Sequence, residues 1–216
     1  MSEVVEKQES EALFSKKRKK LVMDPLTDDN PVTIQVLGIC SALAVTVQLK
    51  PTLIMAIAVT FVIVFSNLLY SLMRNLVPGR IRIIVQLAVI ATFVILVDQV
   101  LKAYSYEMSK TLGAFIGLII TNCIVMGRLE AFAQQNKPWE SVLDGFGSGF
   151  GYSWIILAVA FARELLGSGS VFGFKVFETL GIPYVNNGLM VNPIGAFMIL
   201  GIIIWIQRTK SGYVEH

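Results

Sequence analysis

TLIMAIAVTFVIVFSNLLYSLM, residues Thr52 to Met73, is a stretch without a single charged side chain. A helix needs about 20 mostly apolar residues to cross the hydrocarbon core of a bilayer, so this stretch is long enough to span a membrane. Lipid offers no hydrogen-bond partner to backbone groups, and the stretch lacks the alternating pattern of a barrel strand. The sequence therefore predicts a transmembrane helix here.

The composition of the whole chain points to the same class of protein. Hydrophobic residues make up 55% of the 216 residues, charged residues make up only 15%, and the mean hydropathy is +0.68. A soluble domain carries about 25% charged residues, so we expect an all-α integral membrane protein with six transmembrane helices. The predicted spans are Pro31 to Leu49, Thr52 to Met73, Ile83 to Leu101, Leu112 to Ala131, Gly151 to Leu166 and Val191 to Ile206.

The basic residues predict the orientation of these spans. With the N-terminus in the cytoplasm, thirteen of the 18 Lys and Arg residues fall on the cytoplasmic side, as the positive-inside rule requires. Six spans return the C-terminus to the cytoplasm. The five basic residues on the other side are Lys50, Lys102, Lys110, Arg163 and Lys175.

The chain divides into a tail and one membrane domain. Residues 1–27 are predicted to form a cytoplasmic charged tail, and residues 28–216 a single six-helix domain. The tail has no apolar core beside its charges, so we do not expect a cleavable signal peptide. Its basic run, Lys16 to Lys20, is expected to contact anionic lipid and no nucleic acid.

Cys40 and Cys123 are the only two cysteines, and each lies near the middle of an apolar stretch. At a rise of about 1.5 Å per residue, both reach roughly the midplane, from opposite faces. The pair is either inert packing, which the residues alone favour, or half of a metal site. Two cysteines without CxxC spacing cannot complete an iron–sulfur cluster, and the sole histidine, His216, is terminal. Any metal site would need ligands from another chain.

Small and polar residues around both cysteines predict irregular helices. Gly38 and Ser41 flank Cys40, and Thr121 and Asn122 precede Cys123. Such residues at membrane depth mark close helix contact or a broken helix. The matching depth of the cysteines also suggests two three-helix halves in inverted orientation. We therefore expect an inverted 3+3 repeat in which the first and fourth helices are short or broken, the first one beginning at its N-cap Asn30.

Several long motifs carry a resemblance to a known family. They are Gln35 to Thr46 (QVLGICSALAVT), Arg82 to Gln86 (RIIVQ), Leu118 to Arg128 (LIITNCIVMGR) and Arg163 to Gly169 (RELLGSG). From about Asp28 to Gln207 the chain resembles the D-type membrane subunits of the sodium-translocating NADH:quinone oxidoreductases. The related membrane subunits of the Rnf ferredoxin:NAD oxidoreductases are an alternative, but Ser41-Ala42 and Gln86 fit the sodium-pump type better.

The resemblance implies a place in a redox-driven sodium pump. It implies a non-autonomous subunit of an NADH:quinone reductase in the bacterial inner membrane, which exports sodium and is paired with a homologous six-helix E-type subunit. Cys40 and Cys123, with two cysteines of that partner, would hold an intramembrane iron centre, expected to be [2Fe–2S]. The centre would pass electrons toward quinone. No flavin is expected on this chain.

The glycine-rich stretch Asp144 to Gly151 is expected to pack against another helix. It follows no strand and precedes no lysine, so it does not match a phosphate-binding loop. Gly145 and Gly149 instead have the small-xxx-small spacing of tight helix packing.

Three carboxylates are candidates for an ion pathway. Asp98 has Lys102 four residues later, so a simple ion pair is the competing interpretation. Asp144 is placed on a cytoplasmic loop, where it is either a solvated carboxylate or a collector of sodium. Glu164, beside Arg163 at the outer end of the fifth helix, is either part of a helix-end pair or an exit site.

Two other functions remain open from the sequence. A secondary transporter with a small-molecule site at the midplane would explain the broken helices without a metal. A membrane scaffold within a larger complex is a third possibility. Neither explains why the only two cysteines lie at matching depth.

Overall fold

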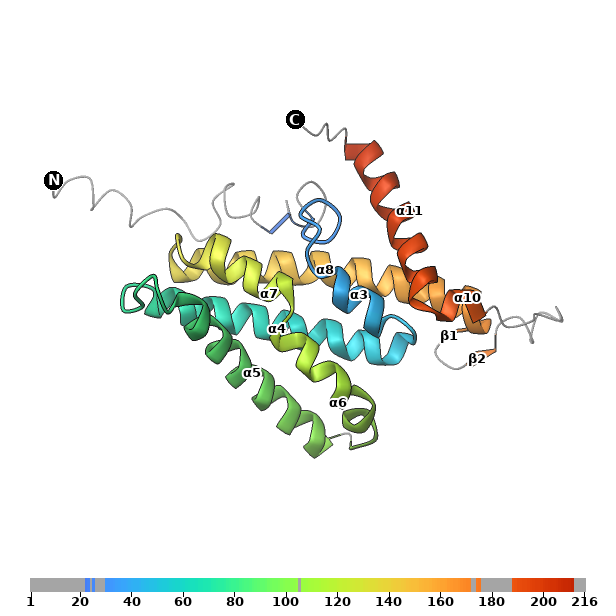
Figure 1. Cartoon of the computed structure of the whole chain (residues 1–216), viewed down its shortest axis with the longest axis horizontal. Coiled ribbons are helices and arrows are strands. Elements are labelled where there is room, and N and C mark those ends of the chain that lie inside the picture. The colour runs from blue at the N-terminus through green and yellow to red at the C-terminus, as the bar shows by residue number, and fades with distance from the viewer. Residues whose placement is uncertain are drawn as a thin grey trace.

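The structure, a computed structural model, is a bundle of helices with one minimal β-hairpin (Figure 1). It describes residues 22–23, 25, 30–104, 106–171, 174–175 and 188–211. Almost all of the charged tail, including Lys16 to Lys20, lies outside the described residues, as does His216. The prediction of an all-helical membrane protein is confirmed in this coarse form, because four helical segments are long and apolar enough to cross a membrane.

The second and third predicted spans are confirmed. They form α4 (Leu49–Met73) and α5 (Arg82–Tyr104). Helix α4 begins after an extended residue, Gln48, and carries Pro51 in its first turn, where a missing N–H costs no helical hydrogen bond. Its buried residues include Val59, Val62 and Ile63 at the centre of the apolar core.

The first predicted span is wrong as a membrane-length helix. Asn30 caps only a turn, in which its side-chain oxygen accepts the N–H of Val32 at 2.9 Å. Val36 and Gly38 then have positive φ values of 58° and 80°, which a right-handed helix cannot include. Helix α3 (Ile39–Val45) follows, and it is seven residues long. The expectation that this segment would be short or broken is confirmed.

The fourth span is also broken. Helix α6 (Tyr106–Ile120) ends before Thr121 and Asn122, and α7 (Cys123–Arg128) begins after them. A π-helical turn, η2 (Leu129–Ala133), continues α7. π-turns inside helices are rare and often mark functional sites.

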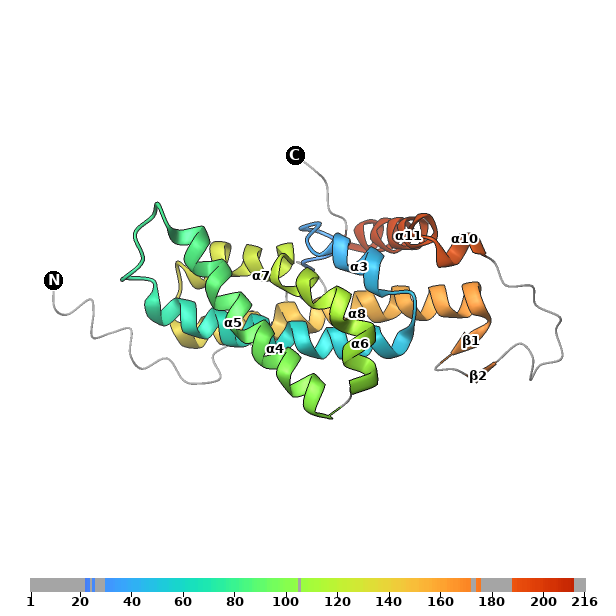
Figure 2. The ribbon, with the colours of Figure 1, turned by 60° about the horizontal axis from the view of Figure 1, so that its bottom comes forward.

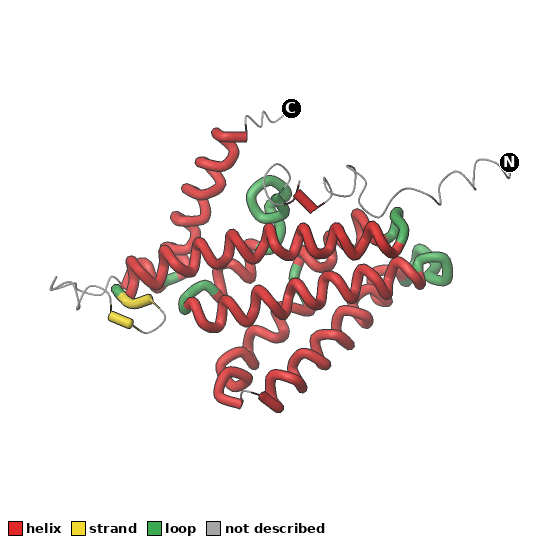
Figure 3. Tube along the Cα trace, turned by 180° about the vertical axis from the view of Figure 1, so that it is seen from behind, coloured by secondary structure: helices red, strands yellow, loops and turns green. Residues whose placement is uncertain are grey.

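The fifth span is longer than predicted. Helix α8 (Pro138–Ser168) starts with a proline at its first position and is capped at its C-terminus by Gly169, whose φ is 64°. Placing Asp144 on a cytoplasmic loop was therefore wrong, because the glycine-rich stretch is helical. Helices α4 and α8 lie side by side along most of their length, as Figures 1 and 3 show from opposite sides.

The glycines of α8 make this close packing possible. A Cβ atom at Gly149 would lie 2.7 Å from Cγ2 of Thr60, and one at Gly145 would lie 3.2 Å from the backbone of Val64. The contact with α4 thus leaves no room for a side chain at Gly149 and little room at Gly145, which confirms the predicted helix-packing role of the stretch.

The C-terminal part packs against α8 and α3. A two-residue strand, β1 (Ser170–Val171), pairs antiparallel with β2 (Phe174–Lys175). Helix α10 (Gly188–Val191) leads into α11 (Pro193–Ser211), which contains most of the last predicted span but is not one of the four membrane-length segments. Helix α11 projects away from α4 and α5 (Figures 1 and 2).

Candidate functional site

Each cysteine lies at the start of a short helix, directly after residues that interrupt the helical conformation. Cys40 is the second residue of α3, and Cys123 is the first residue of α7. Gly38, in the left-handed conformation, makes the first break. Asn122 makes the second, where its side-chain oxygen accepts the N–H of Ile124 at 3.3 Å and caps α7. A break leaves backbone N–H and C=O groups without helical partners. One of these groups, the N–H of Gly38, donates a hydrogen bond to a cysteine sulfur.

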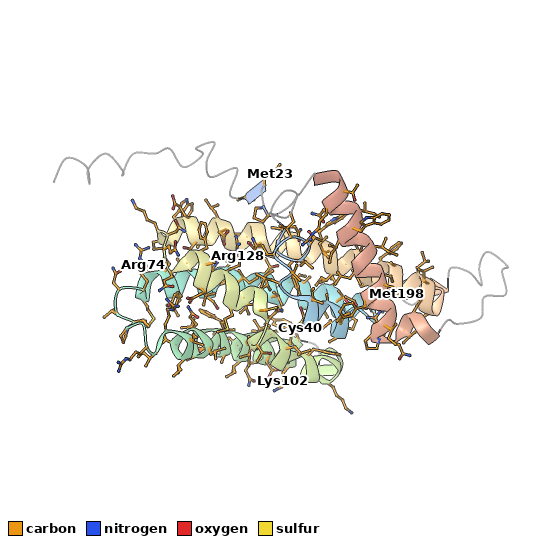
Figure 4. All side chains as sticks on the ribbon, turned by 45° about the horizontal axis from the view of Figure 1, so that its top comes forward. Met23, Cys40, Arg74, Lys102, Arg128 and Met198 are labelled. Carbon is orange, nitrogen blue, oxygen red and sulfur yellow. The ribbon has the colours of Figure 1, made fainter. Side chains whose placement is uncertain are left out.

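The two breaks bring the thiols together. The backbone N–H of Gly38 donates a hydrogen bond to Sγ of Cys123 at 2.8 Å. Gly38 lies two residues before Cys40, so this bond places the Cys123 sulfur beside the start of the helix that carries Cys40. Cys40 is exposed on the surface of this chain and Cys123 is half-buried, and Figure 4 shows Cys40 near the middle of the long axis. The structure thus places the pair where a second protein could reach it.

A polar network ties both breaks to α8. The Ser41 hydroxyl donates to the carbonyl of Gly38 at 2.8 Å and lies 2.7 Å from the hydroxyl of Tyr152. The side-chain amide of Asn122 donates to the same Ser41 oxygen at 3.3 Å. Ser41, Asn122 and Tyr152 are wholly buried. Buried hydrogen-bond networks of this kind rigidify the groups they join.

The thiols of Cys40 and Cys123 fit the chemistry of half of a metal site. Hydrogen bonds from backbone N–H groups to sulfur are a feature of iron–sulfur ligation, and Cys123 has one. Among the residues that the structure describes, no group of three or more His, Cys, Asp and Glu side chains could hold a metal ion. A four-thiolate centre at this place would take its remaining ligands from elsewhere.

Asp144 is buried and paired, so its predicted exposure is wrong. It is 1% exposed and forms an ion pair with Arg128, whose Nε donates to Oδ2 of Asp144 at 3.1 Å. A second guanidinium nitrogen of Arg128 bonds Gln35 Oε1 at 3.3 Å. The pair therefore links α8, α7 and the loop before α3. In Figure 4, Arg128 lies between the positions of Arg74 and Cys40 along the long axis.

The other two carboxylates lie apart from the cysteines. The predicted ion pair of Asp98 is confirmed, because Nζ of Lys102 lies 2.6 Å from its Oδ2. Glu164 accepts the N–H of Leu49 at 2.7 Å and so caps the N-terminus of α4, where a negative charge is favourable.

Arg163 binds different partners from its neighbour Glu164. Its guanidinium donates to the carbonyl of Leu43 at 3.2 Å and to Oγ1 of Thr46 at 2.8 Å, both at the end of α3. It also donates to the carbonyl of Val191 at 2.7 Å. Arg163 thus fastens α3 and α10 to α8.

Tyr152 is the residue of this site that sequence reasoning missed. It lies far from Cys40 in the chain, at a sequence separation of 111 from its partner Ser41. The only signal was a phenol hydroxyl within an apolar helix, which needs a polar partner when it is buried.

Comparison with known proteins agrees with the resemblance. The family model described as "Rnf-Nqr subunit, membrane protein" matches residues 18–204. The D-type subunit of the Na(+)-translocating NADH-quinone reductase of Pasteurella multocida is 56% identical over 204 residues, which cover 93% of this chain and 98% of the relative. The same protein of Proteus mirabilis is 55% identical over 204 residues, with the same coverage. That of Aeromonas hydrophila is 56% identical over 195 residues, covering 89% and 93%.

These relatives favour the sodium-pump type over the Rnf alternative. The similarity extends through nearly the full length of each relative, so it concerns the whole membrane domain. The chain therefore belongs to the Rnf-Nqr family of membrane subunits, among the D-type subunits of the sodium-translocating reductases.

Proposed function

We propose that this chain works as the D-type subunit of a sodium-translocating NADH-quinone reductase in a bacterial inner membrane. The relatives supply the activity, since their names describe this reductase. The four span-length helices agree with a multi-pass membrane subunit. The chain has no activity of its own under this proposal, and contributes to electron transfer within the complex.

Within that role, Cys40 and Cys123 are proposed as two ligands of an iron centre shared with the homologous E-type subunit. The observation that carries this is the contact between the two helix breaks, where the N–H of Gly38, two residues before Cys40, donates to the sulfur of Cys123 at 2.8 Å. When bound, a [2Fe–2S] cluster supplies one-electron transfer. The chain's own residues hold the thiolates, and the N–H dipole stabilises negative charge on the sulfur.

An inverted repeat is proposed on the same geometry. In each half, a cysteine follows a break and starts a short helix, and a long helix comes next: α3 with α4, and α7 with α8. The two long helices pack against each other more extensively than any other pair. This arrangement supports two related halves of three helices, with the cysteines at their junction, a place where membrane transport proteins commonly bind ions and substrates.

The three carboxylates remain proposed residues of the ion pathway. They differ in the partners that they already bind. Asp98 is paired near the surface, and Glu164 is occupied as a helix cap. Asp144 is the buried carboxylate at the end of the bundle where α8 begins (Figure 1), which is the proposed cytoplasmic end. Sodium could reach it only by competing with Arg128, its counter-ion.

The test of the cofactor role replaces one thiol at a time in the intact complex. Cys40→Ala or Cys123→Ala should abolish NADH-driven quinone reduction while the helices still insert, because a gap in the electron chain cannot be bridged from outside. Ser148→Ala serves as the control, since Ser148 is a buried small residue of α8 outside the cysteine network. Full turnover of either cysteine variant would contradict the assignment.

A further inference from the structure

The Ser41 hydroxyl is the centre of the network at the cysteines, and its contacts assign the direction of each hydrogen bond. Its single proton goes to the carbonyl of Gly38 at 2.8 Å. Its oxygen therefore accepts the hydroxyl proton of Tyr152 at 2.7 Å and a proton from the amide of Asn122 at 3.3 Å. The hydroxyl has one donor and two acceptor positions, and all three are used.

Tyr152 also holds Gly38 through its ring. A Cβ atom at Gly38 would lie 3.1 Å from Cε2 and 3.3 Å from Cδ2 of Tyr152, so the ring lies directly against the backbone of Gly38. Because Gly38 has φ 80°, its conformation depends on this absence of a side chain. One tyrosine thus fixes Gly38 with its ring and, by way of Ser41, with its hydroxyl.

Gly38 connects this support to both thiols. Its N–H donates to the sulfur of Cys123. Its carbonyl accepts the N–H of Ala42 at 3.1 Å, which starts the helix that carries Cys40. A rotation of Gly38 would therefore remove the N–H from one sulfur and tilt the helix bearing the other.

We propose that Tyr152 is a positioning residue of the iron centre, whose hydroxyl keeps the Gly38 N–H on the Cys123 sulfur by way of Ser41. This inference rests on the proposed role of the two cysteines. A hydrogen bond to a ligand sulfur favours the more negative, reduced state, and such bonds help to set the reduction potential of iron–sulfur sites. Loss of the hydroxyl should thus make the centre harder to reduce.

The experiment is Tyr152→Phe in the intact complex, which keeps the ring against Gly38 and removes only the hydroxyl. The expected result is unchanged iron content, an altered EPR line shape and a more negative midpoint potential. Tyr70→Phe is the control, because Tyr70 is also a buried tyrosine but lies in α4, outside the Ser41 network. It should show the wild-type potential. A wild-type potential and EPR spectrum for Tyr152→Phe would overturn the proposal.

Ser41→Ala tests the same connection between Tyr152 and Gly38 by removing the hydroxyl that joins them. It should shift the potential in the same direction, and it replaces Tyr152→Phe as the deciding variant if that complex fails to assemble. The double variant should shift the potential no further than the larger single shift, because both changes interrupt one path to Gly38. Fully additive shifts would contradict a shared path.

Cys40→Ala separates failure of this inference from failure of the proposed function. If Cys40→Ala keeps its iron, the cysteines are not ligands and both proposals fall. If Cys40→Ala loses its iron while Tyr152→Phe behaves as wild type, only the positioning role of Tyr152 is wrong.

Discussion

The pair of Arg128 and Asp144 shows how burial changes what one carboxylate can do. On a loop, Asp144 would be solvated and free to collect cations. In α8 it is 1% exposed and bound by a guanidinium. Removing one partner of a buried ion pair costs about 3–5 kcal/mol, because the other charge is left without compensation. Any role of Asp144 toward sodium is therefore tied to the position of Arg128.

We predict that Asp144→Asn lowers the amount of assembled complex and, in the complex that does assemble, raises the sodium concentration for half-maximal quinone reduction. The double variant Arg128→Gln with Asp144→Asn should restore assembly, because it leaves no unpaired charge. It should not restore the sodium response. Sodium titration of the reductase activity decides the matter: an unchanged half-saturation concentration in assembled Asp144→Asn would leave this residue a structural role only.

At the residue scale, the sequence was informative where a residue type is rare. Cys40 and Cys123 were identified because the chain has no other cysteine. The pairing of Asp98 with Lys102 followed from their helical spacing. Tyr152 could not be found in this way, since its importance comes from a contact with Ser41 that only the folded chain creates.

Among the elements, uninterrupted apolar runs were predicted nearly to their bounds, whereas for the irregular first and fourth helices only the existence of a break was predicted. Helices α4 and α5 follow from long apolar stretches, the first flanked by Lys50 and Arg74 and the second by Arg82 and Lys102. The start of α8 could not be placed, because the glycines from Gly145 to Gly151 disfavour a helix in isolation. Packing against α4 stabilises them as helix. The length of α3 could not be predicted either, because the sequence gives no sign that Val36 adopts a positive φ.

We predict that Gly149→Ala destabilises the subunit. The added methyl group would meet Thr60 at 2.7 to 3.0 Å, and overpacking of a close contact costs about 1–3 kcal/mol. Gly201→Ala in α11 is the control, because a Cβ there meets no atom within 4 Å in the described part of the chain. Thermal unfolding of the purified complex should show a lower midpoint for the first variant alone. Equal midpoints would mean that α4 and α8 do not pack as closely as described.

For the whole molecule, the basic residues and the helix ends agree on one orientation. The end of α4 and the starts of α5 and α8 gather at one end of the bundle (Figure 1). Arg74, Arg82 and Lys137 lie at or beside these helix ends. Positive residues are retained on the cytoplasmic side, so this end is the proposed cytoplasmic one. The two chain termini themselves lie outside the described residues.

Reporter fusions test this orientation. Fusions at Arg80 and Gln135 should report the cytoplasm, and fusions at Lys50 and Lys110 should report the outside. Gly181, outside the described residues, is also predicted to be external. An external signal at Arg80 would require the opposite orientation or a different number of spans.

The central claim is that the two helix breaks exist to present Cys40 and Cys123 as half of an intramembrane iron centre. The most direct measurement is the iron content and EPR spectrum of the purified complex with and without each thiol. Cys40→Ala and Cys123→Ala should each lose the iron and the EPR signal of this centre, while Ser148→Ala keeps both. Wild-type iron content and an unchanged signal in either cysteine variant would contradict the account.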